Sequence, residues 1–341
     1  MPLLPQLTRE AALAENLPGG RVRCLACAHR CVLPDGRDGI CGVRANVGGR
    51  LIAPWGYVSG ASPDPIEKKP FFHVLPGART LSFGMFGCNF RCAFCQNWNI
   101  SDARTASAAG AEKVSAAGLA ELAASSGAKV LVSTYNEPLI TAEWAAEIFA
   151  EGKKRGLRAG FVSNGYATPE AADLLRPVMD LWKVDLKTFD AQKYSRVCGA
   201  RLDRVLDGIR LIKERGFWLE VVTLLIPGFN DSDAEVSAMA AFLAGLSADI
   251  PWHLTAFHPD HKMTDTPPTR ASALYRAREL ALAAGLRYVY CGNIHGARGQ
   301  DTVCPCCGRA VITRDGFSVT SNLISPGGVC PCGARLPGVW G

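Results

Sequence analysis

The sequence of 341 residues contains no apolar run long enough to cross a bilayer, and no apolar signal segment follows its first five residues. We therefore expect a cytoplasmic protein without a membrane-bound part. Like charges do not form runs either, and the formal net charge of +6 is small and spread along the chain. This distribution of charge gives little reason to expect a nucleic-acid partner.

The composition is otherwise that of an ordinary globular protein, with 48% hydrophobic and 20% charged residues, and the length allows one large domain with small appendages. Cysteine is the exception, because the chain has fourteen. A reducing cytoplasm disfavours disulfides, so clustered cysteines indicate metal sites. Twelve of them fall into three groups, whereas Cys198 and Cys291 stand alone and are expected to be buried small hydrophobic residues.

The first group has the spacing C-x2-C-x3-C-x9-C and comprises Cys24, Cys27, Cys31 and Cys41. Four thiolates at this spacing suit a closed structural zinc site, which we expect first, or a second iron–sulfur cluster. A segment without metal is a further alternative. The spacing cannot separate zinc from iron, because thiolates bind both.

The last group forms two short cysteine knuckles with a β-like stretch between them, which is typical of a zinc ribbon. The expected ligands are Cys304, Cys307, Cys330 and Cys332, which leaves Cys306 spare. Such a ribbon would cap the main domain or dock a partner.

The middle group, Cys88, Cys92 and Cys95, has the spacing C-x3-C-x2-C, with the aromatic Phe94 before its last member. A 4Fe–4S cluster needs four ligands, so three cysteines leave one iron without a protein ligand. An open position of this kind suits a catalytic centre rather than an electron carrier. Part of a zinc knuckle is the alternative interpretation.

Strand-like and helix-like segments alternate between residues 79 and 291, which predicts a parallel sheet with helices outside it. Six apolar segments suggest an α/β fold with a partial (β/α)6 TIM-like barrel. We expect a Cys-rich segment at 1–78, the barrel at 79–296 and the ribbon-like segment at 297–341. The six predicted strands are residues 81–86, 130–134, 160–163, 181–186, 218–226 and 252–257.

Polar residues follow several of these strands, at the rim where barrel enzymes carry their chemistry. Each has a simpler explanation as a turn residue, a local ion pair or a structural histidine, but their convergence on the rim of the cysteine loop favours a cofactor site. The residues are Asn136, Glu137, Ser163, Asn164, Asp185, Lys187 and His258. By contrast, residues 66–73 are predicted to form a short surface loop with a structural His73.

The motif GCNFRCAFCQNW at residues 87–98 resembles the signature of radical S-adenosylmethionine (radical SAM) enzymes. Over residues 20–341 the chain resembles the radical SAM member of the AmmeMemoRadiSam system, a relative of pyruvate formate-lyase activating enzymes. The other matching stretches are IEKKPFFH at 66–73, TYNEP at 134–138, VDLKTFD at 184–190, LIPGFND at 225–231, TAFHPD at 255–260 and GNIHG at 292–296.

The resemblance implies a 4Fe–4S cluster whose fourth iron binds SAM, and reductive cleavage of SAM to a 5′-deoxyadenosyl radical that abstracts hydrogen from a substrate. It places Asn136 and Glu137 near the amino group of SAM, in place of a Gly-Gly-Glu segment. Asp185 and Lys187 match a pair near the ribose and carboxylate. His258 corresponds to a histidine at the adenosyl end, and Phe94 would pack near adenine.

No general acid or base is expected, since the radical performs the abstraction. The resemblance also implies reduced ferredoxin or flavodoxin as electron donor and an association with Memo-like and AMMECR-like proteins. One alternative is a glycyl-radical-enzyme activase that acts on a partner protein. Another is a non-catalytic metal-binding scaffold or RNA-binding protein with a vestigial barrel.

Overall fold

A computed structural model describes residues 4, 6–104, 106, 108–294, 296 and 298–341, and its largest element is an eight-stranded sheet. Seven of the strands are parallel and follow one another in chain order, and β8 is added antiparallel at one edge. The strands are β8 (Gly60–Pro65), β9 (Arg79–Gly84), β11 (Val130–Ser133), β12 (Arg158–Ser163), β13 (Leu181–Asp185), β14 (Trp218–Leu225), β15 (Trp252–Ala256) and β16 (Val289–Gly292).

All six predicted strands are present, with ends shifted by at most a few residues. The prediction missed β16, which is short, and β8, which contains two prolines. Among the described strands, β8 and β16 form the two edges of the sheet. The strand order is therefore observed, whereas the curvature of a partial barrel stays a prediction.

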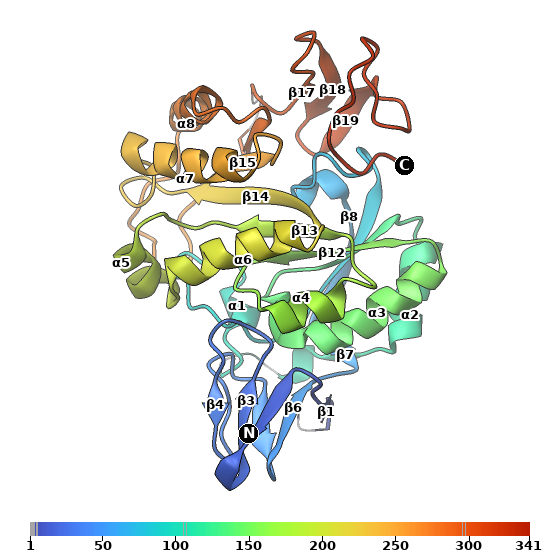
Figure 1. Cartoon of the computed structure of the whole chain (residues 1–341), viewed down its shortest axis with the longest axis vertical. Coiled ribbons are helices and arrows are strands. Elements are labelled where there is room, and N and C mark those ends of the chain that lie inside the picture. Colours follow the sequence, from blue (N-terminus) through green and yellow to red (C-terminus); the bar gives the residue numbers. More distant parts are fainter. Residues whose placement is uncertain (1–3, 5, 105, 107, 295, 297) are drawn as a thin grey trace.

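Helices connect consecutive parallel strands, as parallel pairing requires (Figure 1). Side chains cap two of these helices: Thr168 Oγ1 accepts a hydrogen bond from the Ala171 amide, and Ser232 Oγ accepts one from the Glu235 amide. The longer helices are α2 (Ala116–Ser125), α3 (Ala142–Lys154), α4 (Pro169–Leu175), α6 (Leu202–Glu214), α7 (Asp233–Leu246) and α8 (Ala271–Ala283). Shorter ones are α1 (Trp98–Ser101), α5 (Ala191–Lys193) and the turns η1 (Pro18–Gly20), η2 (Ile66–Lys68), η3 (Ala108–Gly110), η4 (Pro138–Thr141) and η5 (Tyr194–Cys198).

Small antiparallel sheets form the two ends of the molecule, the N-terminal strands at one end and the ribbon at the other (Figure 1). The N-terminal strands are β1 (Thr8–Glu10), β2 (Ala14–Leu17), β3 (Arg21–Cys24), β4 (Val32–Leu33), β5 (Ala45–Val47) and β6 (Arg50–Pro54). The ribbon contains β17 (Thr302–Val303), β18 (Ala310–Asp315) and β19 (Ser318–Asn322).

The predicted division at residues 78/79 stays a proposal, and two strand pairings cross it. One is β8 with β9, and the other is β7 (Tyr57–Val58) with β10 (Glu112–Lys113). The lone cysteines, Cys198 and Cys291, are buried as expected. None of the helices in the described parts of the chain is long and apolar enough to cross a membrane.

The prediction of a surface loop at residues 66–73 is wrong, because most of this segment is buried between the sheet and the ribbon. Glu67 and Arg314 are each 0% exposed at the side chain, with 3.5 Å between their charged atoms. His73 is structural, as expected: its ring contacts the Pro337 carbonyl at 2.7 Å and the Tyr290 hydroxyl at 2.6 Å. The mixed sequence of the segment concealed this, because Glu67, Phe72 and His73 have partners more than 140 residues away.

Candidate functional site

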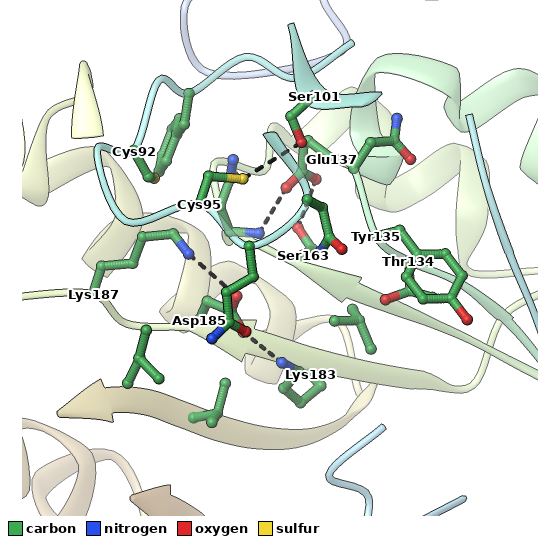
Figure 2. Close-up of a pocket in the computed structure, with 18 of the residues that line it drawn as sticks. Cys92, Cys95, Ser101, Thr134, Tyr135, Glu137, Ser163, Lys183, Asp185 and Lys187 are labelled. Atoms are coloured by element: carbon green, nitrogen blue, oxygen red, sulfur yellow. Dashed lines mark hydrogen bonds and ion pairs between the residues drawn. The ribbon is translucent and has the colours of Figure 1, made fainter. Parts of the chain in front are cut away.

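A cavity of about 400 Å³ opens where the parallel strands β9, β11, β12 and β13 end. Ten predicted site residues line it, and they come from four separate stretches of the chain. They are Cys88, Cys92, Phe94, Cys95, Asn136, Glu137, Ser163, Asn164, Asp185 and Lys187. The structure therefore brings together the cysteine loop and the polar ends of the next three strands (Figure 2).

The cysteine loop is fixed by contacts to the turn η5 and to the N-terminal segment. The amides of Arg91 and Ala93 donate to the carbonyls of Cys198 and Val197 at 2.8 and 3.0 Å. Gly87 has φ 91°, and a Cβ there would lie 2.8 Å from the Cys41 carbonyl oxygen, so only glycine fits. The loop is thus shaped by backbone contacts before any metal binds.

The three loop sulfur atoms have different surroundings. The Cys198 thiol hydrogen-bonds to the Cys92 sulfur and lowers its pKa, with help from Lys187 and against the effect of burial. Burial and the nearby Glu137 raise the pKa of Cys88 well above its ordinary value. Cys95 lies 3.7 Å from the Ser101 hydroxyl. The three sulfurs, all in described residues, are not mutually within 4.8 Å.

A carboxylate between two lysines forms the floor of the cavity (Figure 2). Asp185 contacts Lys183 Nζ at 2.5 Å and Lys187 Nζ at 3.2 Å. Burial alone would raise the pKa of Asp185, but the two ammonium groups overcome this effect and hold it at about 2. Burial likewise disfavours the charged form of Lys187, yet Asp185 and Cys92 raise its pKa well above the ordinary value. Asp185 and Lys187 are therefore charged at neutral pH, whereas burial lowers the pKa of Lys183 against the opposing effect of Asp185.

Glu137 is the other buried acid of the cavity, with 2% of its surface exposed. Burial raises its pKa to about 7, against the opposing hydrogen bonds from the Asn164 amide, the Leu139 amide and the Ser163 hydroxyl. The Asn164 amide donates at 2.7 Å and the Ser163 hydroxyl at 2.8 Å. Glu137 thus joins the ends of β11 and β12, and its charge is sensitive to what binds beside it.

Asn136 hydrogen-bonds to the backbone of the segment that leads into the cysteine loop. Its Oδ1 accepts from the Met85 amide at 3.1 Å, and its Nδ2 donates to the Gly87 carbonyl at 3.0 Å. The preceding Tyr135 has φ 73°, a left-handed conformation that is uncommon for a tyrosine and is found most often at functional sites. The side chain of Asn136 therefore positions the loop rather than projecting freely into the cavity.

His258 is the one predicted cofactor residue outside the cavity lining. It is exposed, and its Nε2 lies 2.8 Å from Gln96 Nε2, which does line the cavity. Phe94 is buried and packs 5.8 Å from the ring of Phe229. The His295 residue of the GNIHG stretch lies outside the described residues.

Sequence reasoning missed several lining residues, among them Lys183, Gln96, Ser101, Asn293 and Phe317. Lys183 gave a signal, since a lysine inside an otherwise apolar strand must find a buried partner. Asn293 lies in the GNIHG stretch that carried the resemblance, but Phe317 gave no signal, because it reaches the cavity from the ribbon turn.

The ribbon cysteines form a compact group at the opposite end of the chain. The sulfur atoms of Cys304, Cys307, Cys330 and Cys332 all lie within 4.8 Å of one another. Two of their separations, Cys304–Cys332 and Cys307–Cys330, are 3.8 Å. Cys306 is exposed and does not belong to the group. Four thiols this close together could hold one metal ion, and they are the four that the sequence predicted as ligands.

The N-terminal cysteines Cys24, Cys27, Cys31 and Cys41 line a separate small cavity. Cys24 and Cys27 are buried, and the other two are partly exposed. The cavity is also lined by His29, Arg44 and Asn89. The predicted group is thus assembled in space, although its sulfur atoms are farther apart than those of the ribbon.

Comparison with known proteins gives three informative similarities. Residues 83–240 match the family model described as the radical SAM superfamily. An uncharacterized protein of Methanocaldococcus jannaschii is 37% identical over 308 residues, which cover 90% of this chain and 91% of that protein. A pyruvate formate-lyase-activating enzyme of Staphylococcus aureus is 24% identical over 192 residues, covering 54% of this chain and 76% of that enzyme.

Among solved structures, Streptococcus suis SuiB bound to the precursor peptide SuiA has a TM-score of 0.50 at 13% identity. The similarity covers 67% of this chain and 52% of SuiB, and at this identity it concerns the fold alone. The family model includes the cysteine loop and the strand ends that line the cavity, and this match decides the family. The chain belongs to the radical SAM superfamily.

Proposed function

We propose that this protein is an enzyme that binds a 4Fe–4S cluster at Cys88, Cys92 and Cys95 and cleaves SAM reductively. The observation that carries the proposal is the position of these three thiols on the wall of a cavity that also contains the Lys183–Asp185–Lys187 trio. Three thiolates would ligate three irons of the cluster and leave the fourth iron for another ligand. When bound, the cluster supplies the electron for cleavage of SAM to methionine and a 5′-deoxyadenosyl radical.

The side chains of the cavity match the charges of SAM. Lys187 would neutralise the carboxylate of SAM, and Asp185 would accept hydrogen bonds from the ribose hydroxyls. Glu137, with its raised pKa, would gain its negative charge when the amino group of SAM binds beside it. The volume of about 400 Å³ lies within the range of small-molecule sites.

Phe94 and Asn164 would complete the cofactor site. Phe94 lies 5.8 Å below the Lys187 ammonium, measured from its ring centre, and offers a flat apolar face for adenine. Asn164 Nδ2 donates to Asn89 Oδ1 at 2.7 Å, so it fixes the residue that follows Cys88. His258 would reach the adenosyl end through Gln96, and Ser163 would act by orienting Glu137.

The experiment that tests the proposal is anaerobic reconstitution with iron and sulfide, followed by SAM and dithionite, with quantification of 5′-deoxyadenosine. The expected product depends on SAM, on the reductant and on Cys92, so a Cys92→Ala variant makes none. A loaded cluster that yields no 5′-deoxyadenosine would refute the proposal and favour a metal-binding scaffold or an RNA-binding protein.

A second candidate is a glycyl-radical-enzyme activase, favoured by the 24% identity to enzymes named pyruvate formate-lyase-activating. In that case the substrate would be a glycine of a partner protein. Electron paramagnetic resonance of a co-purified partner after turnover would show a glycyl radical for an activase and none for an enzyme of small molecules.

The remaining parts of the proposal follow from the resemblance and from the ribbon. We infer zinc at Cys304, Cys307, Cys330 and Cys332, because four close thiolates suit it. Reduced ferredoxin or flavodoxin would supply electrons in the cytoplasm. Memo-like and AMMECR-like proteins would be partners if the chain belongs to the AmmeMemoRadiSam system, which pull-down from the native host would test.

A further inference from the structure

The four N-terminal cysteines surround a pocket whose geometry differs from that of a zinc site. A zinc ion bound to four thiolates at about 2.3 Å brings their sulfur atoms to about 3.8 Å from one another. The ribbon meets this condition, with two separations of 3.8 Å and all four sulfurs within 4.8 Å. Of Cys24, Cys27, Cys31 and Cys41, all described, no three sulfur atoms lie mutually within 4.8 Å.

This difference in spacing separates two kinds of metal site. In a four-iron cluster each thiolate binds a different iron, so the sulfur ligands stand apart at the corners of a larger body. The loop cysteines Cys88, Cys92 and Cys95 share this wider spacing. Gly39 lies between two of the N-terminal ligands. A Cβ at this position would be 3.7 Å from the sulfurs of both Cys31 and Cys41.

Hydrogen-bond donors surround the N-terminal sulfurs. The amides of His29 and Ile40 donate to Cys27 and Cys31, and the amides of Val43 and Arg44 donate to Cys41. Such donors stabilise the negative charge of ligating thiolates and raise the reduction potential of iron–sulfur clusters. Burial nevertheless raises the pKa of Cys27, Cys31 and Cys41, so thiolates at this site need the positive charge of a metal in addition to these donors.

Two residues that line this pocket have a buried donor with no partner in good hydrogen-bond geometry among the described residues: the donor atoms are Asn89 Nδ2 and Arg44 Nε. Asn89 and Arg44 are each 1% exposed, and the Asn89 side chain is directed at Cys27. The other guanidinium nitrogens of Arg44 bind Glu143, both at 2.7 Å. An unpaired buried donor is costly, so each is expected to have an acceptor in the metal-loaded protein. A cluster supplies sulfide as well as thiolate acceptors.

Asn89 also connects this pocket to the radical SAM loop. It follows Cys88 directly, and its carbonyl oxygen lies 2.9 Å from His29 Nε2. Two neighbouring loop residues contact the same segment: Arg91 donates to the Ile40 carbonyl at 2.9 Å, and Gly87 packs on the Cys41 carbonyl. The pocket and the loop therefore share one wall.

We propose that Cys24, Cys27, Cys31 and Cys41 hold a second four-iron, four-sulfide cluster instead of the zinc that their spacing in the sequence suggested. All four irons have a protein ligand, so this cluster transfers electrons and does not bind SAM. Asn89 hydrogen-bonds to its Cys27 ligand and couples its surroundings to the loop of the first cluster. The assignment does not depend on the proposed SAM chemistry.

The test uses the full chain with Cys88, Cys92 and Cys95 all changed to Ala, reconstituted anaerobically with iron, sulfide and zinc. The expected content is about four irons and one zinc per chain, against about eight irons and one zinc in the parent. The Mössbauer spectrum of this variant should be that of a 4Fe–4S cluster. The electron paramagnetic resonance signal of its reduced cluster should not change when SAM is added. Two zincs without iron, or one zinc without iron, would overturn the proposal.

Two further variants guard against a loss of metal caused by misfolding. Cys27→Ala/Cys31→Ala in the parent should retain about four irons with a SAM-responsive signal, and retention of about eight irons would overturn the assignment. Cys306→Ala, which alters an exposed cysteine outside every proposed site, should match the parent in metal content.

In the triple-alanine chain, Asn89→Leu should shift the midpoint potential of the remaining cluster to a more negative value. An unchanged potential would refute the role of Asn89.

Discussion

Each end of the molecule carries four cysteines that we propose as metal ligands, but the two ends arrange them differently. At the ribbon the four sulfur atoms converge within 4.8 Å, whereas those of the N-terminal segment do not. The N-terminal group shares one wall with the radical SAM loop, and the ribbon lies at the far end of the sheet (Figure 1). Spacing along the chain cannot distinguish these arrangements, but separation in space can.

The largest effect is expected when one proposed ligand is removed from each end, which tests whether the two metal sites are distinct. Cys330→Ala should abolish the single ribbon zinc and leave the iron content unchanged, because a tetrahedral site does not close with three thiolates. Cys24→Ala should do the reverse, lowering iron and sparing zinc. Metal analysis by inductively coupled plasma mass spectrometry measures both. A loss of iron in Cys330→Ala would mean that the two ends do not load independently.

The next prediction concerns the attachment of the ribbon. Arg314→Met should lower the free energy of unfolding by about 3 kcal/mol, because it leaves the buried Glu67 without its cation. It also removes hydrogen bonds to the carbonyls of Gln300 and Phe72. Chemical denaturation monitored by tryptophan fluorescence is the measurement.

Arg287→Met is the matched control for this prediction. Arg287 pairs with Asp249 at 2.8 Å, but its side chain is 53% exposed, so its loss should matter by less than about 1 kcal/mol. Equal effects of the two substitutions would show that the ribbon is not held by buried charge.

In the cavity between the two ends, Asp185→Asn should slow formation of 5′-deoxyadenosine by about 30-fold, which corresponds to about 2 kcal/mol. The change leaves Lys183 and Lys187 without their shared carboxylate and removes a charged acceptor from the cavity. Asp207→Asn, on the exposed face of α6, serves as control and should not alter the rate. A rate for Asp185→Asn equal to that of the parent would exclude this trio from the cofactor site.

The smallest expected effect is a pH dependence of stability. Burial lowers the pKa of His73 from 6.5 to about 4, so the folded protein keeps this ring neutral while the unfolded chain takes up a proton below pH 6.5. The unfolding free energy should therefore fall as the pH decreases from 6.5 toward 4, with about 1 kcal/mol lost by pH 5.5. His73→Gln should make this slope shallower in denaturation series at several pH values. A slope identical to that of the parent would assign the dependence to other groups.

The parts of the fold that local chemistry determines were predictable from the sequence. Buried parallel strands are continuous apolar runs, and the residues after them could be placed on one rim, which is how Asp185 and Glu137 were found. The ribbon ligands followed from the knuckle pattern. Lys183 was missed because the role of a lysine within an apolar strand is not evident until the cavity beside it is known.

Long-range polar contacts were not predictable. The burial of residues 66–73 depends on Arg314, Glu220 and Tyr290, which no local pattern connects with that segment. His258 was placed correctly at the rim but not in the cavity lining, because its loop carries it outward to Gln96. The preference for zinc at the N-terminal cysteines rested on spacing alone, which contains no information about sulfur–sulfur distances.

The burial of residues 66–75 beneath the ribbon has a consequence for synthesis of the protein on the ribosome. Phe72 meets Arg314 across 242 residues, and His73 meets Pro337 across 264. During translation Glu67 therefore lacks Arg314, and His73 lacks the Pro337 carbonyl, until the strands of the large sheet have all been made. Only then can the ribbon cover this edge of the sheet.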